Sequence, residues 1–390
     1  MAKRTSKDLE DGRRNREPTM EDITDALDRI MNGDHSHWNQ PGAAAHAVTG
    51  RPNVAGIDRN HRRVDEAISA GAILANLPLT DGQRAFADEL SKLWSQGESQ
   101  GERLTRRGCS CPGSPHDSVH FHSYEISNHR AWRSWRHGDL AGTKYQRAPR
   151  GTRQLRWWCD SLREAARHYS WAEKPGKGFS DLSSDLQRAM AAGNAGMTVA
   201  TCVEIFRWGE VDKEHKNEQW LQAKGESIIA DIKNAVSLLS PGCTSSLSSF
   251  DGGRLCMNSA MTKVYAAADP AQQVIIYDGR VGAALCLFIR HHLKQKGANE
   301  VPAELRFLWG PPQLTRTSAA EVAKRNPSDE TFTFQKLRDY GVTDRRRAEV
   351  SRAASAILSA ATHGCPLREI EKALFMIGYA VRSPWAITFL

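Results

Sequence analysis

Lys263 and Asp278 are the residues whose types and spacing best suit chemistry, and they lie in the most informative stretch of the sequence, residues 250–297. Lys263 falls in a short helical pattern. The apolar run Val274–Tyr277 then leads directly into Asp278, which precedes a predicted helix of roughly 18 residues, or about 27 Å. A carboxylate at the start of a helix can accept helix N–H bonds, which hold it in one orientation. If Asp278 faces a cleft, it becomes a fixed negative charge beside a ligand.

The sequences around these two residues resemble motifs of the helix-hairpin-helix DNA glycosylase superfamily. Thr262-Lys263-Val264 resembles the start of that family's lysine helix, and residues 276–281 (IYDGRV) resemble its V-D-x-H-V element. By this resemblance Asp278 is the catalytic carboxylate, which stabilises the oxocarbenium-like sugar or orients the attacking water. Lys263 matches the lysine that forms a Schiff base with the sugar in bifunctional members, and otherwise becomes a phosphate ligand.

Several features of the chain depart from the family pattern. The family's hairpin, roughly L-P-G-V-G, is replaced by residues 252–259 (GGRLCMNS), the spacing between the lysine and the aspartate is shorter than usual, and Arg280 replaces a common histidine. No four-cysteine iron–sulfur cluster follows. The long N-terminal part and the lost hairpin favour a specialised member over a housekeeping repair enzyme, for example one that removes hypermodified bases from phage DNA.

The resemblance implies that double-stranded DNA is the partner and that the modified or damaged base is flipped out into a pocket. Aromatic residues should line that pocket, and the candidates are Trp208, Tyr265 and Tyr277. Alternatively, these three aromatic side chains belong to the hydrophobic core. The candidates for DNA contact are Arg254, Arg280, Arg133, Arg136, Arg153 and Arg156, with Arg316, Lys324 and Arg325 as further candidates.

Positive charge is concentrated in the middle of the chain. The whole sequence carries a net charge of +8, and residues 101–170 hold 13 basic against 6 acidic residues. Five of the 11 tryptophans lie within 101–171. Arg neutralises phosphates and flat rings stack on unpaired bases, so this stretch favours nucleic-acid binding. The alternative is a solvated arginine-rich face with tryptophans turned inward.

A short segment gathers potential metal ligands, namely Cys109, Cys111, His116 and His120, followed by His122. Two thiolates and two imidazoles could form a tetrahedral structural zinc site, although C-x-C is not the usual knuckle spacing. The alternative is an exposed loop with incidental cysteines. The glycosylase hypothesis needs no cofactor. The second hypothesis for the whole chain is a non-catalytic nucleic-acid-binding protein with a small zinc module.

Helical periodicity predicts a mostly α-helical fold, with a helical glycosylase-like domain and an irregular, basic N-terminal or accessory region. The expected helices are Met20–Met31, Asp81–Ser95, Arg153–Trp171, Asp181–Met190, Val199–Trp208, Asn217–Leu239, Asn258–Ala267, Gly279–Lys296, Thr343–Ala361 and Leu367–Ala380. Thr80 is expected to cap the second of these, 97–114 to form a loop, and Gln272–Tyr277 to be a short strand. The expected domains are a loosely ordered segment 1–60, an accessory basic region 61–150 and a helical catalytic domain 151–390.

Composition excludes several classes of protein. At 390 residues, with 40% apolar and 25% charged residues, the chain is neither a collagen nor a disulfide scaffold. Eight scattered cysteines favour a reducing compartment. No apolar run approaches the length of a membrane span and no secretory signal is evident, so we expect a cytoplasmic protein without a membrane partner. Phosphate-loop, dinucleotide-binding, serine-hydrolase and H-E-x-x-H motifs are also absent from the sequence.

Overall fold

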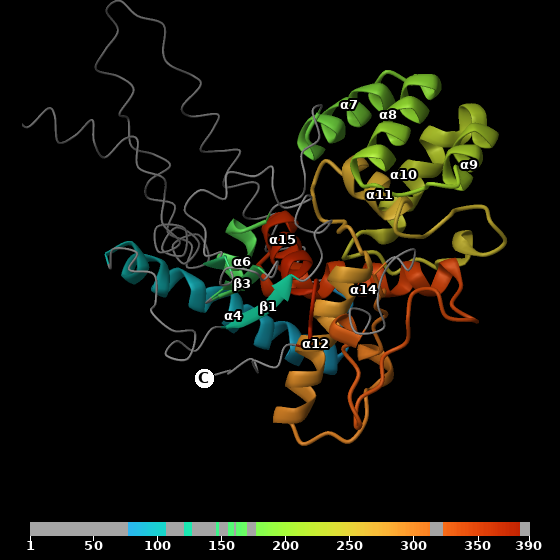
Figure 1. Cartoon of the computed structure of the whole chain (residues 1–390). Helices are drawn as coiled ribbons and strands as arrows, with labels where there is room; N and C mark the ends of the chain where they lie inside the picture. The colour runs from blue at the N-terminus through green and yellow to red at the C-terminus, as the bar shows by residue number, and fades with distance from the viewer. Residues whose placement is uncertain are drawn as a thin grey trace, which may run out of the picture. The chain divides into compact units, whose positions relative to one another are not determined.

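The described part of the chain is mostly α-helical and includes one small three-stranded sheet (Figure 1). The computed structural model describes residues 77–106, 121–126, 146–147, 155–159, 161–169, 177–312 and 323–382. All of them belong to one compact unit, Val64–Leu390. No helix in these ranges is long and apolar enough to cross a membrane.

Five helices pack around one core and are called here the α7–α11 lobe. They are α7 (Phe179–Ala191), α8 (Ala195–Trp208), α9 (Lys216–Lys224), α10 (Ile228–Leu239) and α11 (Met261–Ala268). Leu182, Leu186 and Met190 recur at every fourth position of α7 and face this core. The side chain of Asn194 caps α8 by accepting from the N–H of Met197 at 2.9 Å. Local amphipathic patterns therefore account for most of this lobe.

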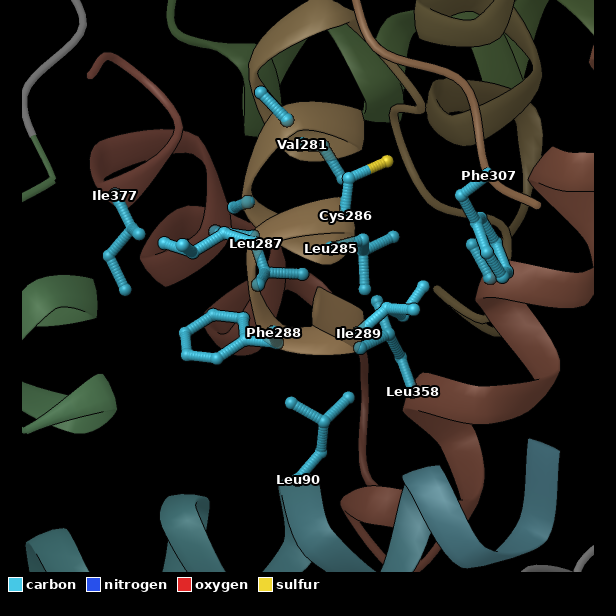
Figure 2. Packing of buried hydrophobic residues seen from close by; sticks show 14 of the residues in the cluster. Leu90, Val281, Leu285, Cys286, Leu287, Phe288, Ile289, Phe307, Leu358 and Ile377 are labelled. Atoms are coloured by element: carbon cyan, nitrogen blue, oxygen red, sulfur yellow. The ribbon is translucent and has the colours of Figure 1, made fainter. Parts of the chain in front are cut away.

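A second core forms around α12 and defines the α12 lobe. Its helices are α4 (Asp81–Arg106), α6 (Leu162–Arg167), α12 (Gly279–Gln295), α14 (Asp344–Ala361) and α15 (Arg368–Ile377). Figure 2 shows Leu285, Phe288 and Ile289 of α12 among apolar side chains from the neighbouring helices, including Leu90 and Leu358. Because α12 is buried almost all round, it is the central helix of this lobe.

The sheet corrects one helix prediction. β1 (His122–Ile126) and β2 (Gln146–Arg147) both pair antiparallel with β3 (Leu155–Cys159), and His122 lies opposite Cys159. Residues 155–159 were expected to begin the helix Arg153–Trp171, but the helix α6 covers only Leu162–Arg167. The side chain of Ser161 caps it by accepting from the N–H of Glu164 at 3.1 Å. The aromatic residues Trp157 and Trp158 favour a strand once a partner strand is available.

Other helix predictions are confirmed, with shifted ends. The helix expected from Asp81 is capped by Thr80, whose hydroxyl accepts from the N–H of Gln83 at 3.2 Å, and it continues to Arg106 through part of the expected loop. The helix expected over Asn217–Leu239 is broken by the 3₁₀ turn Gly225–Ser227, because Gly225 adopts a left-handed φ of 53°. The expected helix Met20–Met31 lies outside the described residues.

The expected strand Gln272–Tyr277 is not a strand. The segment forms no ladder with another strand among the described residues. Its backbone N–H groups instead bond to side chains, for example Val274 to Asp269 at 2.8 Å and Tyr277 to Thr262 at 2.9 Å. Two further 3₁₀ turns, Ser248–Phe250 and Ala303–Leu305, complete the connections that border the two cores.

Candidate active site

A cleft of about 1320 Å³ lies between the two lobes. One wall comes from the end of α8, the loop to α9 and the start of α11. The other wall comes from the start of α12, the loops near 310, 325 and 338, and α15. Small-molecule sites usually measure about 300–1,000 Å³. The size of this cleft therefore suits a segment of a larger ligand.

The cleft is lined by many charged side chains. Its basic residues are Lys213, Lys216, Lys263, Arg280, Lys324, Arg325, Lys336, Arg338 and Arg347, and its acidic residues are Glu210, Asp212, Glu214, Asp278, Asp339, Asp344 and Glu371. Nine positive charges against seven negative ones leave a modest positive excess. One of these carboxylates, Glu371, is also paired with Arg368, which does not line the cleft, at 2.8 Å. This balance favours an anionic ligand that is contacted at selected points.

Asp278 is the N-cap of α12 and lines the cleft. Its Oδ1 accepts hydrogen bonds from the backbone N–H of Arg280 at 2.8 Å and of Val281 at 3.0 Å. Both bonds go to one oxygen, and Oδ2 makes no hydrogen bond to the described residues. The positive end of the helix dipole also favours the carboxylate there. The predicted N-cap role is confirmed, and the second oxygen is available to a ligand.

Three glycines allow the start of α12 to sit directly against neighbouring backbone. A Cβ on Gly279 would lie 2.7 Å from the Cα of Gly310, and one on Gly282 would overlap the carbonyl of Leu308. On the C-terminal side of α15, a Cβ on Gly378 would overlap the carbonyl of Arg280. Only residues without a side chain permit these approaches. The backbone that carries Asp278 is thus held from two sides.

Lys263 is buried on α11 at the floor of the cleft. Only 6% of the residue is exposed, and its Nζ donates to the carbonyl of Ser259 at 2.9 Å. Its methylene chain lies against Gly209 at the end of α8, where a Cβ would come within 2.7 Å of it. Burial lowers the pKa of the Lys263 amine, and the negative charges of Asp278 and Glu371 oppose that effect.

A short turn brings the lysine helix back toward Asp278. The carboxylate of Asp269 accepts from the N–H groups of Ala271, Gln273 and Val274 at 3.0, 2.7 and 2.8 Å, which confirms the expected turn. The hydroxyl of Thr262, next to Lys263, then donates to the carbonyl of Ile275 at 3.2 Å. The two elements are tied together side by side, so the amine and the carboxylate line one cleft.

Two arginines flank Asp278 on the α12 side. The Arg280 guanidinium stacks over the ring of Phe375 at 4.4 Å. Arg325 is 7% exposed, and its Nε donates to the carbonyl of Tyr379 at 3.3 Å. Burial, reinforced by the nearby charge of Arg280, lowers the pKa of Arg325 to about 9. Together with Lys324 these residues line the cleft and could contact phosphates.

Glu371 and Tyr169 are cleft residues that the sequence patterns did not single out. Glu371 is 7% exposed on α15, and burial raises the pKa of its carboxyl group. Burial, together with the charges of Glu371 and Asp278, likewise raises the pKa of Tyr169. The signal that could have identified Glu371 is its spacing of four from Phe375, which places both residues on one face of α15.

The three residues predicted to form a base pocket have different positions. Trp208, at the end of α8, lines the cleft and packs against Phe179 with ring centroids 4.7 Å apart. Tyr277 also lines it, although its hydroxyl donates to the carbonyl of Leu308 at 2.7 Å. Tyr265 does not line the cleft. It is fully buried in the α7–α11 core, where its hydroxyl donates to the carbonyl of Cys256 at 2.7 Å, so its assignment as a pocket residue is corrected to a core role.

The remaining candidates for DNA contact are scattered. Arg254 is exposed but does not line the cleft, and its carbonyl accepts from Lys224 at 2.6 Å. Arg156 lies in β3, where only its backbone is described. Arg133, Arg136, Arg153 and Arg316 lie outside the described residues.

The candidate zinc ligands Cys109, Cys111, His116 and His120 also lie outside the described residues. Within the described ranges no group of three or more potential metal ligands occurs. His122, which follows that segment, is 1% exposed and its Nε2 lies 2.9 Å from the carbonyl of Ala380. Burial lowers the pKa of His122 to about 4, so its ring is a neutral core group near pH 7.

Comparisons of the chain with models of known protein families, with curated proteins and with solved structures found no match.

Proposed function

We propose that this protein is a DNA N-glycosylase that removes a modified or damaged base from double-stranded DNA and leaves an abasic site. One observation carries the proposal. A carboxylate fixed at a helix N-terminus, Asp278, and a buried amine, Lys263, line the same large cleft. This arrangement supports the roles that the motif resemblance implies for the two residues.

The reaction is the cleavage of the bond between the sugar C1′ and the base nitrogen. As this bond breaks, its electron pair leaves with the base and positive charge develops on the sugar. The carboxylate of Asp278 stabilises that charge or orients a water whose oxygen attacks C1′. The base takes up a proton as it leaves. Because Oδ1 is occupied by two backbone N–H groups, Oδ2 is the oxygen that faces the reacting centre.

The second residue, Lys263, has two roles compatible with its position. As nucleophile its neutral amine attacks C1′ and displaces the base, and the lowered pKa increases the neutral fraction. As phosphate ligand it stays charged. Borohydride treatment distinguishes the two roles, since it reduces a Schiff base to a stable covalent adduct between the chain and DNA, and Lys263→Met removes that adduct.

The cleft walls suit a nucleotide. Trp208 supplies aromatic surface, whereas Arg280, Lys324 and Arg325 supply positive charge beside Asp278. Extruding a base from the duplex requires both, because the base loses its stacking partners and the backbone must be held. One substrate to test is hypermodified phage DNA. Release of a base from that DNA would indicate a role in defence against phage.

The decisive experiment measures base release. The full chain is incubated with ordinary bacterial DNA, with deaminated or oxidised DNA, and with phage DNA carrying glucosylated hydroxymethylcytosine, and abasic sites are scored with an aldehyde-reactive probe. Abasic sites on one substrate that disappear with Asp278→Asn support the proposal. Salt-dependent binding without abasic sites on any substrate contradicts it and favours the non-catalytic nucleic-acid-binding protein.

A further inference from the structure

Arg368 and Glu371 form an ion pair on α15 that contacts both elements of the candidate site. Nη1 of Arg368 lies 2.9 Å from Oε1 and 2.8 Å from Oε2 of Glu371. The side chains are 16% and 9% exposed, so the pair is largely removed from solvent. The attraction within a buried ion pair repays its desolvation only when the geometry is good and the remaining polar atoms are hydrogen-bonded.

The outer atoms of the pair bond to two different backbone segments. Nη2 of Arg368 donates to the carbonyl of Ala266 at 2.8 Å, three residues beyond Lys263 on α11. Oε2 of Glu371 accepts from the N–H of Ile276 at 2.6 Å, two residues before Asp278. One ion pair therefore bridges the helix that carries the amine and the segment that carries the carboxylate.

The charge of Glu371 also acts on Lys263. The charged groups that face the Lys263 amine are Asp278 and Arg280 from the start of α12 and Glu371 from α15, while α8 contributes the backbone of Gly209. Asp278 and Glu371 favour the protonated amine, and Arg280 and burial favour the neutral one. Arg368 partly offsets the charge of Glu371, since it holds both carboxylate oxygens.

We propose that Arg368 and Glu371 are positioning residues, which hold Lys263 and Asp278 at a fixed separation, and that Glu371 places its carboxylate charge on the side of the Lys263 amine. This inference rests on the proposed glycosylase function for its catalytic meaning. Neither residue needs to touch the DNA. Their effect is transmitted through the two backbone hydrogen bonds and through the charge of the carboxylate.

The electrostatic part is tested without DNA. In Glu371→Gln the amide oxygen can still accept from Ile276, so the segment keeps its position while the charge is lost. The titration of Lys263 is followed by NMR of ¹³C-lysine-labelled full chain, and its resonance is assigned by its absence in Lys263→Met. We expect the pKa of Lys263 to fall in Glu371→Gln, because a charge that favours the protonated amine is lost.

Glu369→Gln is the matched control, because Glu369 is on the same helix but pairs with Lys372 and does not line the cleft. It should leave the Lys263 titration unchanged. An unchanged titration in Glu371→Gln, with a shift in Asp278→Asn showing that the method responds, would overturn the electrostatic part. This result is independent of whether any base is released.

The geometric part is tested with Arg368→Gln, which breaks the bond to Ala266 and releases Glu371. We expect kcat for base release to fall about 10- to 100-fold with KM unchanged, and Arg368→Lys to restore part of it because a charge remains beside Glu371. Equal kcat values in Arg368→Gln and the unmodified chain would overturn the positioning role while leaving the glycosylase proposal intact. A lack of base release in every variant would instead contradict the glycosylase proposal, and the Lys263 titration would still decide the inference.

Discussion

The two lobes meet at one cleft, but they contribute to it in different ways. The α7–α11 lobe supplies Lys263 from within a helix, where the amine is buried and its pKa is lowered. The α12 lobe supplies Asp278 from the N-cap of a helix, where backbone N–H groups hold the carboxylate at the surface of the cleft. The carboxylate is oriented by N–H groups of its own helix, whereas the amine, in the first turn of α11, is buried against Gly209 at the end of α8. The two candidate groups therefore depend on different parts of the fold.

The two lobes also differ in how closely their glycines approach neighbouring backbone. In the α12 lobe, Gly282 and Gly378 meet backbone carbonyls directly. In the α7–α11 lobe, a Cβ added to Gly193 or Gly242 would meet no neighbouring atom of the described chain within 4 Å. The α12 lobe also buries His122 and partly buries His291, whereas His215 of the other lobe is exposed. At these positions the backbone around the start of α12 is packed more closely than the backbone at Gly193 and Gly242.

The largest expected effect comes from Asp278→Asn. Asn is as good an N-cap as Asp, so the helix should keep its stability, but the negative charge is lost. If the glycosylase proposal holds, base release should fall roughly 10²–10³-fold while the thermal unfolding midpoint changes little. Single-turnover kinetics and calorimetry on the same preparations check this. A large loss of stability would show that the carboxylate is mainly structural.

Acid should destabilise the α12 lobe first. The pKa of His122 is about 4 when folded against 6.5 in the unfolded chain, so the unfolded state binds more protons between these values. Its contribution to stability is complete above pH 6.5 and is lost as pH falls toward 4, by on the order of 3 kcal/mol. Hydrogen exchange at pH 7.5 and 5, corrected for intrinsic rates, should show earlier opening of α12 and α15 than of α7 and α8. Equal opening of both lobes at pH 5 would contradict the prediction.

Glycine substitutions should separate the lobes by packing. Gly378→Ala places a methyl group on the carbonyl of Arg280, and we expect it to reduce the free energy of unfolding by about 1–3 kcal/mol. Gly242→Ala, in an exposed loop of the other lobe, is the control and should be nearly neutral. Urea denaturation measures both. A neutral Gly378→Ala would mean that the start of α12 can move away from α15.

The smallest effects are expected from two buried tyrosines. Tyr265→Phe removes one hydrogen bond to Cys256 and should cost about 1 kcal/mol without altering base release, since its ring does not line the cleft. Tyr277→Phe removes the hydroxyl that bonds to both the carbonyl and the N–H of Leu308. It should therefore lower the free energy of unfolding by more than Tyr265→Phe does. Chemical denaturation ranks the two variants, and a loss of base release in Tyr265→Phe would return that residue to the pocket.

Local features of the fold were the predictable ones. The turn at Asp269, the helices over α7, α8, α12 and α14, and the cap at Asp278 all follow from short-range patterns. The strand β3 was missed because its partner, β1, lies far from it in the sequence. The expected strand Gln272–Tyr277 failed for the opposite reason, since side chains from other elements satisfy its backbone groups.

The sequence by itself determined which residue begins α12, because an N-cap needs only an aspartate and the helical pattern after it. Only the tertiary structure decided that Lys263 is buried beside the cleft, that Tyr265 is core, and that Glu371 faces the lysine from α15. These properties depend on contacts between residues up to about a hundred positions apart, as in the bond between Arg368 and Ala266. Burial and charge proximity are set by the packing of the two lobes, and no short-range pattern encodes them.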